Sequence, residues 1–206
     1  RCGLGPGGRG LQGKKIVNRT GDWYPKRTMG LLLDKAAAKW GDREAIIYKG
    51  DSWAFADWKR ETDRLAKGLI AYGVEPGDRV AVWMVNRPEW LFIMFAIAKV
   101  GACIVPLNTR YRTDDLAYTL AQSRSSLLIS VARSGPVAYR AMLADAMPDI
   151  GHGSGDALEL EAFPELRRIV FLGDERLPNT TSWDDMLVAG GAVSACLLYT
   201  SPSPRD

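Results

Sequence analysis

Apolar residues between positions 79 and 107 form two short, nearly continuous runs joined by a longer apolar segment. The runs Arg79–Met84 and Ala102–Leu107 are rich in β-branched residues, which is typical of strands buried on both faces. The segment between them, Pro88–Val100, predicts a helix, and Pro88 suits its first position because a proline has no N–H to leave unpaired there. Gly101 then ends the helix. The pattern predicts a strand–helix–strand unit with two parallel strands.

The segment that precedes this unit has the period of a surface helix. We expect a helix over Met29–Trp40, capped by Thr28 and ended by Gly41. Its predicted inward face consists of the apolar side chains Leu32, Leu33, Ala36, Ala37 and Trp40. The helix is therefore expected to pack on the domain through this stripe.

A hairpin and a second amphipathic helix follow in the sequence. Ala45–Tyr48 and Ser52–Phe55 are short strand-like runs around the turn residues 49–51. Asp57–Tyr72 predicts the helix, with Gly73 suited to the left-handed position after its end. We expect an inward stripe of Trp58, Leu65, Ala66, Leu69 and Ile70, and an outward face of Lys59, Arg60, Asp63 and Lys67.

Strands and helices continue to alternate after residue 107. We expect a helix capped by Thr113, a strand over Ser126–Ser130, a helix over Pro136–Met147, a strand over Arg168–Leu172, and a short helix from Ser182 to about Gly190. Asp114 and Asp115 follow the first of these caps. Adjacent helical carboxylates point about 100° apart, so they predict dipole capping rather than a metal or acid–base pair. The alternation predicts an α/β fold with a doubly wound, mostly parallel sheet.

Charge and cysteine content narrow the function classes. The net charge is +3, but four basic residues lie within the first 15 positions, which leaves the remainder near −1 and predicts no nucleic-acid surface. Cys2, Cys103 and Cys196 form no CxxC pair, and Cys103 is expected to be a small core residue. With no apolar secretion segment, we expect a cytoplasmic protein with no transmembrane segment, for which peripheral membrane association stays open.

The wording of two segments carries a family resemblance. Trp53–Leu69 and Ile97–Tyr111, the latter reading IAKVGACIVPLNTRY, resemble the first and second core segments of the adenylate-forming superfamily of acyl-CoA synthetases, luciferases and adenylation domains. The similarity extends over about residues 28–190 and includes FPELRRIVFLGD and TSWDDMLVAG. Within the superfamily the wording is most similar to fatty-acyl and related carboxylate–CoA ligases of fatty acid metabolism.

The resemblance implies a two-step ligation. A carboxylate attacks the α-phosphate of ATP with Mg²⁺ to form an acyl-adenylate and pyrophosphate, and the thiol of coenzyme A then displaces AMP to form a thioester. The implied partners are small carboxylates, fatty or related organic acids; the oligomeric state is left open. In the family, the catalytic residues lie downstream of these segments, so we assign no catalytic or metal-binding residue here, and His152 has no orienting partner in the sequence.

Three regions are expected along the chain. Residues 1–27 form a glycine-rich tail, and 28–195 form an incomplete N-terminal part of an AMP-binding domain. Residues 196–206, CLLYTSPSPRD, match the translation of a transposase-type sequencing adapter, so we expect them to be non-native. We therefore expect a fragment that is itself inactive.

One ligand contact is implied within the fragment. In similar CoA ligases, an Asn-Pro-Arg-like triplet after the second core segment brings its arginine near the CoA phosphates, and the matching triplet here is Asn108-Thr109-Arg110. Arg110 is the candidate cofactor-binding residue, because a guanidinium fork suits phosphate. The alternative is that Arg110 is a surface charge at a strand end. Two other functions remain open: an amino-acid adenylation domain, and a non-catalytic α/β binding module.

Overall fold

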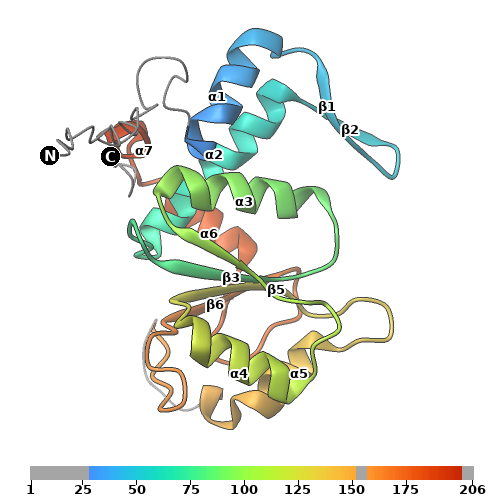
Figure 1. Cartoon of the computed structure of the whole chain (residues 1–206), viewed down its shortest axis with the longest axis vertical. Helices are drawn as coiled ribbons and strands as arrows, with labels where there is room; N and C mark the ends of the chain where they lie inside the picture. Colours follow the sequence, from blue (N-terminus) through green and yellow to red (C-terminus); the bar gives the residue numbers. More distant parts are fainter. Residues whose placement is uncertain (1–27, 152–156, 201–206) are drawn as a thin grey trace, which may run out of the picture.

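The computed structural model describes residues 28–151 and 157–200 (Figure 1). The expected tail over residues 1–27, Cys2, His152 and residues 201–206 lie outside the described residues. The described elements are, in order, α1 (Met29–Trp40), β1 (Glu44–Tyr48), β2 (Asp51–Ala54), α2 (Phe55–Ala71), β3 (Arg79–Trp83), α3 (Pro88–Val100), β4 (Cys103–Pro106), α4 (Thr113–Ser123), β5 (Leu127–Val131), α5 (Tyr139–Ala146), the 3₁₀ turn η1 (Pro148–Gly151), β6 (Arg168–Leu172), β7 (Thr181–Ser182), α6 (Trp183–Gly190) and α7 (Ala195–Thr200).

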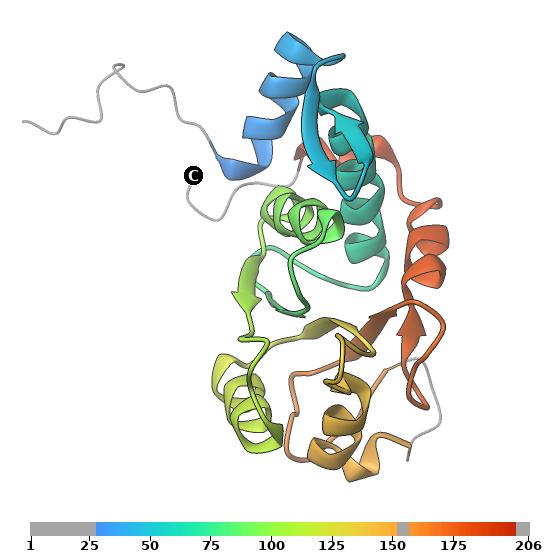
Figure 2. The ribbon, with the colours of Figure 1, turned by 90° about the vertical axis from the view of Figure 1, so that its right-hand side faces the viewer.

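Within the described ranges, five parallel strands form the central sheet in the order β4-β3-β5-β6-β7. Helices α2, α3 and α6 lie on one face of this sheet, and α4 and α5 lie on the other (Figure 1). The hairpin β1–β2 is antiparallel and lies with α1 at the opposite end of the molecule from α4 and α5 (Figure 2). The predicted doubly wound α/β fold is confirmed.

The predicted strand–helix–strand unit is confirmed and forms the centre of the core. β3 and β4 pair in parallel with Val80 opposite Ile104, and Val80–Trp83 are all buried to 1% exposure or less. Helix α3 has the predicted bounds, and Gly101 takes a left-handed conformation with a φ of 83° at its end. Strand β5 is buried at all five positions, because helices cover both faces of the sheet there.

Three predictions about the direction of side chains are wrong. In α1, Leu33 is buried as predicted, but Leu32 and Trp40 are exposed and Gly30 is buried in their place. Cys103 is exposed, because β4 is an edge strand of the described sheet. Asp63 points inward from α2 and pairs with Lys99 of α3, whose side chain is only 3% exposed. Asp63 faces inward because the buried ammonium group of Lys99 is its partner, and the periodicity of polar residues along α2 does not indicate such a partner.

The helix caps were predicted with mixed success. Ser182 caps α6 as expected, since its Oγ accepts a hydrogen bond of 3.0 Å from the Asp185 amide. Thr113 does not cap α4; it is the first helical residue, and the carboxylate of Asp115 accepts a 3.2 Å hydrogen bond from the Arg112 amide. The predicted capping role of the acidic pair is therefore confirmed for Asp115.

Candidate functional site

The candidate site lies at the edge of the sheet where the parallel strands end. Loops 84–87, 107–112, 132–138 and 173–180 leave β3, β4, β5 and β6 at this edge, on the right of Figure 1. Numbered from β3, the strand order is 2-1-3-4-5, and open sheets of this order bind ligands outside the carboxyl ends of their strands where the chain changes direction. The loop from β3 leads to α3 on one face, whereas the loops from β4 and β5 lead to the opposite face.

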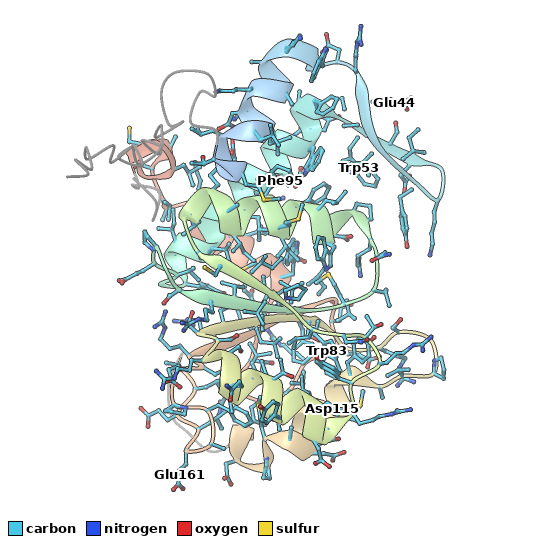
Figure 3. All side chains as sticks on the ribbon, in the orientation of Figure 1. Glu44, Trp53, Trp83, Phe95, Asp115 and Glu161 are labelled. Carbon is cyan, nitrogen blue, oxygen red and sulfur yellow. The ribbon has the colours of Figure 1, made fainter. Side chains whose placement is uncertain are left out.

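Two aromatic side chains pack against each other at this edge of the sheet. Trp83, the last residue of β3, stacks on Tyr139, the first residue of α5, with ring centroids 4.2 Å apart and planes inclined by 16°. Both are buried, and Figure 3 shows Trp83 between the sheet and α5. Burial raises the pKa of the Tyr139 phenol above its ordinary value of 10.0, although hydrogen bonds with the side chains of Thr109 and Ser134 act in the opposite direction. The hydroxyl group is therefore a donor at neutral pH.

The loop with the predicted ligand contact is attached to this aromatic pair. Trp83 Nε1 donates a 3.0 Å hydrogen bond to the carbonyl of Asn108, and the Tyr139 hydroxyl donates one of 3.2 Å to the carbonyl of Thr109. The Arg110 amide donates to Asn108 Oδ1 at 3.0 Å, which closes the turn. The triplet thus has a defined main-chain conformation directly after β4.

Arg110 itself is exposed at this edge. Among the described residues no acidic side chain forms an ion pair with its guanidinium. An unpaired guanidinium in solvent offers a fork of N–H donors that matches phosphate oxygens. The geometry is compatible with an anion contact and equally with a surface charge.

Sequence reasoning missed two further arginines that follow strands at the same edge. Arg133 is exposed in the loop after β5. Arg87, in the loop after β3, is held by Glu89, which accepts from its Nε at 2.7 Å and from its Nη2 at 2.5 Å. These hydrogen bonds raise the pKa of Arg87. The signal that could have found both residues is an arginine within four positions of the end of a parallel strand.

A cavity of about 300 Å³ adjoins the loop after β3. It lies between the hairpin and the start of α3 and is lined mainly by apolar side chains; its lining includes Ile46, Tyr48, Asn86, Arg87 and Trp90. No group of three or more His, Cys, Asp or Glu side chains in the described part of the chain could hold a metal ion. No helix in the described ranges is long and apolar enough to cross a membrane.

Comparisons with known proteins point to one family. A family model described as AMP-binding enzyme matches residues 33–201. The Bacillus subtilis protein YngI, named as an acyl-CoA synthetase, is 32% identical over 169 residues, which cover 81% of this chain and 31% of YngI. The mouse mitochondrial medium-chain acyl-CoA ligase ACSF2 is 31% identical over 178 residues, which cover 85% of this chain and 29% of that protein.

A solved structure is similar as well. A Rhodopseudomonas palustris protein, named as a long-chain fatty acid CoA ligase, matches with a TM-score of 0.65 and 26% identity over 78% of this chain and 36% of that one. The chain spans about three tenths of the length of the curated relatives it matches. The shared region therefore covers a minor part of those proteins.

Proposed function

Because the chain belongs to the AMP-binding enzyme family, we propose that it forms the N-terminal part of an ATP-dependent carboxylate–CoA ligase. The names of YngI and ACSF2, both acyl-CoA synthetases or ligases, support this assignment over the rest of the family. The proposed substrates are fatty or related organic acids. The first step forms an acyl-adenylate and pyrophosphate from the acid and ATP, and the second transfers the acyl group to the thiol of coenzyme A.

Among the ligands that the reaction requires, coenzyme A is the one for which a described residue, Arg110, is a suitable partner. Coenzyme A carries phosphates on its nucleotide, and the exposed guanidinium of Arg110 suits such an anion. ATP and Mg²⁺ supply the phosphoryl chemistry when they are bound, and we assign neither to a described residue. The contribution proposed for this chain is a fixed main-chain turn, Asn108–Arg110, that presents a cation at the carboxyl edge of the sheet.

The role of Arg110 is tested by the affinity of the complete gene product for coenzyme A. Arg110→Ala removes a charge-assisted contact worth about 1.5–3 kcal/mol, so we expect coenzyme A to bind roughly ten- to a hundredfold more weakly. Arg124→Ala is the matched control, because Arg124 is exposed at the end of α4, where β5 begins at the opposite edge. Equal affinity of the Arg110 variant and the wild type would contradict the role.

The proposed boundaries can be tested separately. We propose that residues 28–195 are the native part of the domain and that 196–206 derive from an adapter. Sequencing the source DNA across the Ala195 codon decides this, because a native frame continues into a Ser/Thr/Gly-rich loop with a lysine. We expect no acid-dependent pyrophosphate release from the 206-residue chain itself, and measurable release would contradict that expectation.

Two outcomes would favour the other candidate functions. Pyrophosphate release that depends on an amino acid, without transfer to coenzyme A, would indicate an adenylation domain that feeds a carrier protein. A complete gene without the downstream loop and lysine would indicate a non-catalytic binding module.

A further inference from the structure

We infer that Trp83 and Tyr139 are positioning residues, which hold the main chain of Asn108–Arg110 so that the arginine is presented at the carboxyl edge of the sheet. The inference has a structural half, the anchoring of the loop by the two aromatic side chains, and a functional half, the effect on the anion contact of Arg110. Only the functional half rests on the proposed function. Trp83 and Tyr139 act through the loop and are not assigned a contact with substrate.

The two hydrogen bonds connect separate segments of the chain. Their donors come from the end of β3 and the start of α5, and their acceptors are successive carbonyls in the loop after β4. The donors lie 25 and 30 residues from their acceptors in the sequence. The pair therefore joins three segments of chain that meet at this edge, and it fixes the loop relative to both neighbouring strand ends.

The side chains that donate these two hydrogen bonds are themselves fixed by burial and stacking. Trp83 is 0% exposed and Tyr139 is 1% exposed, and each ring lies flat against the other. The main chain of Trp83 is also held, because the hydroxyl of Ser130 on β5 donates to its carbonyl at 3.1 Å. Side chains in a close-packed interior cannot change rotamer without displacing neighbours. The two polar atoms therefore occupy one position each.

The amide of Leu107, which precedes the triplet, donates a 2.9 Å hydrogen bond to the Val82 carbonyl of β3, whereas the remaining bonds of Asn108–Arg110 are short-range. The Arg110 amide donates to Asn108 Oδ1, and the Tyr111 amide donates to the Asn108 carbonyl, both at 3.0 Å. These bonds close a turn but do not connect the turn to the sheet. Without the two aromatic donors the turn would be attached to the sheet only through Leu107 at its start, and ordering the turn on binding an anion would reduce affinity.

Amide hydrogen exchange of the 206-residue chain tests the structural half. Tyr139→Phe removes one hydroxyl and keeps the ring stack, and a hydrogen bond of this kind corresponds to roughly three- to tenfold in local opening. We expect exchange at Arg110 and Tyr111 to be faster by that factor relative to exchange in β6. Tyr118→Phe is the matched control, because Tyr118 lies on α4 and is 69% exposed. An unchanged ratio in Tyr139→Phe would overturn the inference.

A coenzyme A titration of the same proteins tests the functional half. Tyr139→Phe is expected to weaken binding about three- to tenfold when Arg110 is present and to have no further effect in the Arg110→Ala background. An equal loss in both backgrounds would overturn positioning through Arg110. If the wild type binds no coenzyme A, or if Arg110→Ala binds as well as the wild type, the proposed role of Arg110 fails, while hydrogen exchange still decides the anchoring.

Discussion

Helices α1 and α3 are similar in length and pack on each other, yet different forces hold them in place. In α3, eight of the thirteen residues are buried, and Ile93 and Ala96 are completely inaccessible. In α1, only two of the twelve residues are buried, namely Gly30 and Leu33. Burial of apolar surface holds α3 in place, whereas α1 buries little apolar surface and is held in place by specific contacts with α2 and α3.

The specific contacts of α1 are an ion cluster and a close approach of main chains. Among the described residues, the cluster contains two lysines and two aspartates: Lys99 from α3, Asp34 from α1, and Lys59 and Asp63 from α2. Lys99 Nζ lies 2.7 Å from Asp34 Oδ1 and also pairs with Asp63. A Cβ on Gly30 would come within 2.9 Å of the Lys99 Cα, so only glycine allows the helices to lie this close. Burial of a charge is tolerated here because the partners neutralise it.

The largest expected effect is the loss of the buried lysine. Lys99→Ala leaves Asp34 and Asp63 close together with Lys59 as their remaining counter-charge among the described residues, so we expect the free energy of unfolding to fall by about 3 kcal/mol. Urea denaturation measures the change, and hydrogen exchange should show α1 losing protection before α3. Lys35→Ala, at an exposed position of α1, is expected to change stability by less than about 0.5 kcal/mol. Equal losses in the two variants would contradict the account.

A smaller effect is expected at the close approach of α1 to α3. Gly30→Ala forces its new methyl group against the main chain of Lys99 and Ala98, which cannot yield as a flexible side chain does. We expect a loss of about 1–3 kcal/mol, although alanine is the better helix former. The exposed position Ala38 should show the opposite dependence, since Ala38→Gly costs about 1 kcal/mol through helix propensity alone. A more stable Gly30→Ala protein would show that the helices are not in close contact.

The smallest effect is expected at the partly exposed ion pair at the start of α3. Partial burial is the largest single effect and acts to raise the pKa of Glu89, but the hydrogen bonds from Arg87, a backbone hydrogen bond and the charge of Arg87 together hold the pKa below its ordinary 4.5. The stabilisation is therefore present above about pH 4.5 and is lost as the pH falls through the lowered pKa. We expect Glu89→Gln to cost less than about 1 kcal/mol at pH 7 and nothing at a pH well below 4. A difference in unfolding free energy that persists in acid would contradict this origin.

The same contrast explains which parts of the fold were predicted from the sequence. The bounds of α3 and β6 were correct, Gly73 was recognised as a left-handed glycine and Gly101 as the end of α3, because apolar runs and their end signals are local. The inward face of α1 was wrong in part, because its packing also depends on Lys99, which lies 65 residues from its partner Asp34. The periodicity of apolar residues indicates that a helix is amphipathic, but the element that packs against the helix determines which of its side chains are buried.

The candidate site follows the same rule. Arg110 was identified from a triplet within one loop, through a family resemblance. Trp83 and Tyr139 were not identified, because the feature that makes them relevant is a pair of hydrogen bonds to carbonyls of a different segment. Every residue has a main-chain carbonyl, so the residue type does not show which carbonyl accepts a hydrogen bond. No sequence pattern could therefore indicate these bonds. The packing of β3 and α5 in the folded chain brings the two rings next to the loop.

The most direct test of the central proposal is carboxylate-dependent pyrophosphate release by the complete gene product, with ATP, Mg²⁺ and coenzyme A, followed by mass spectrometry of the thioester. A panel of fatty, aryl and amino acids should be compared. We expect a fatty or related organic acid to drive pyrophosphate release and to appear as its acyl-CoA. A folded complete protein that releases no pyrophosphate with any acid would contradict it.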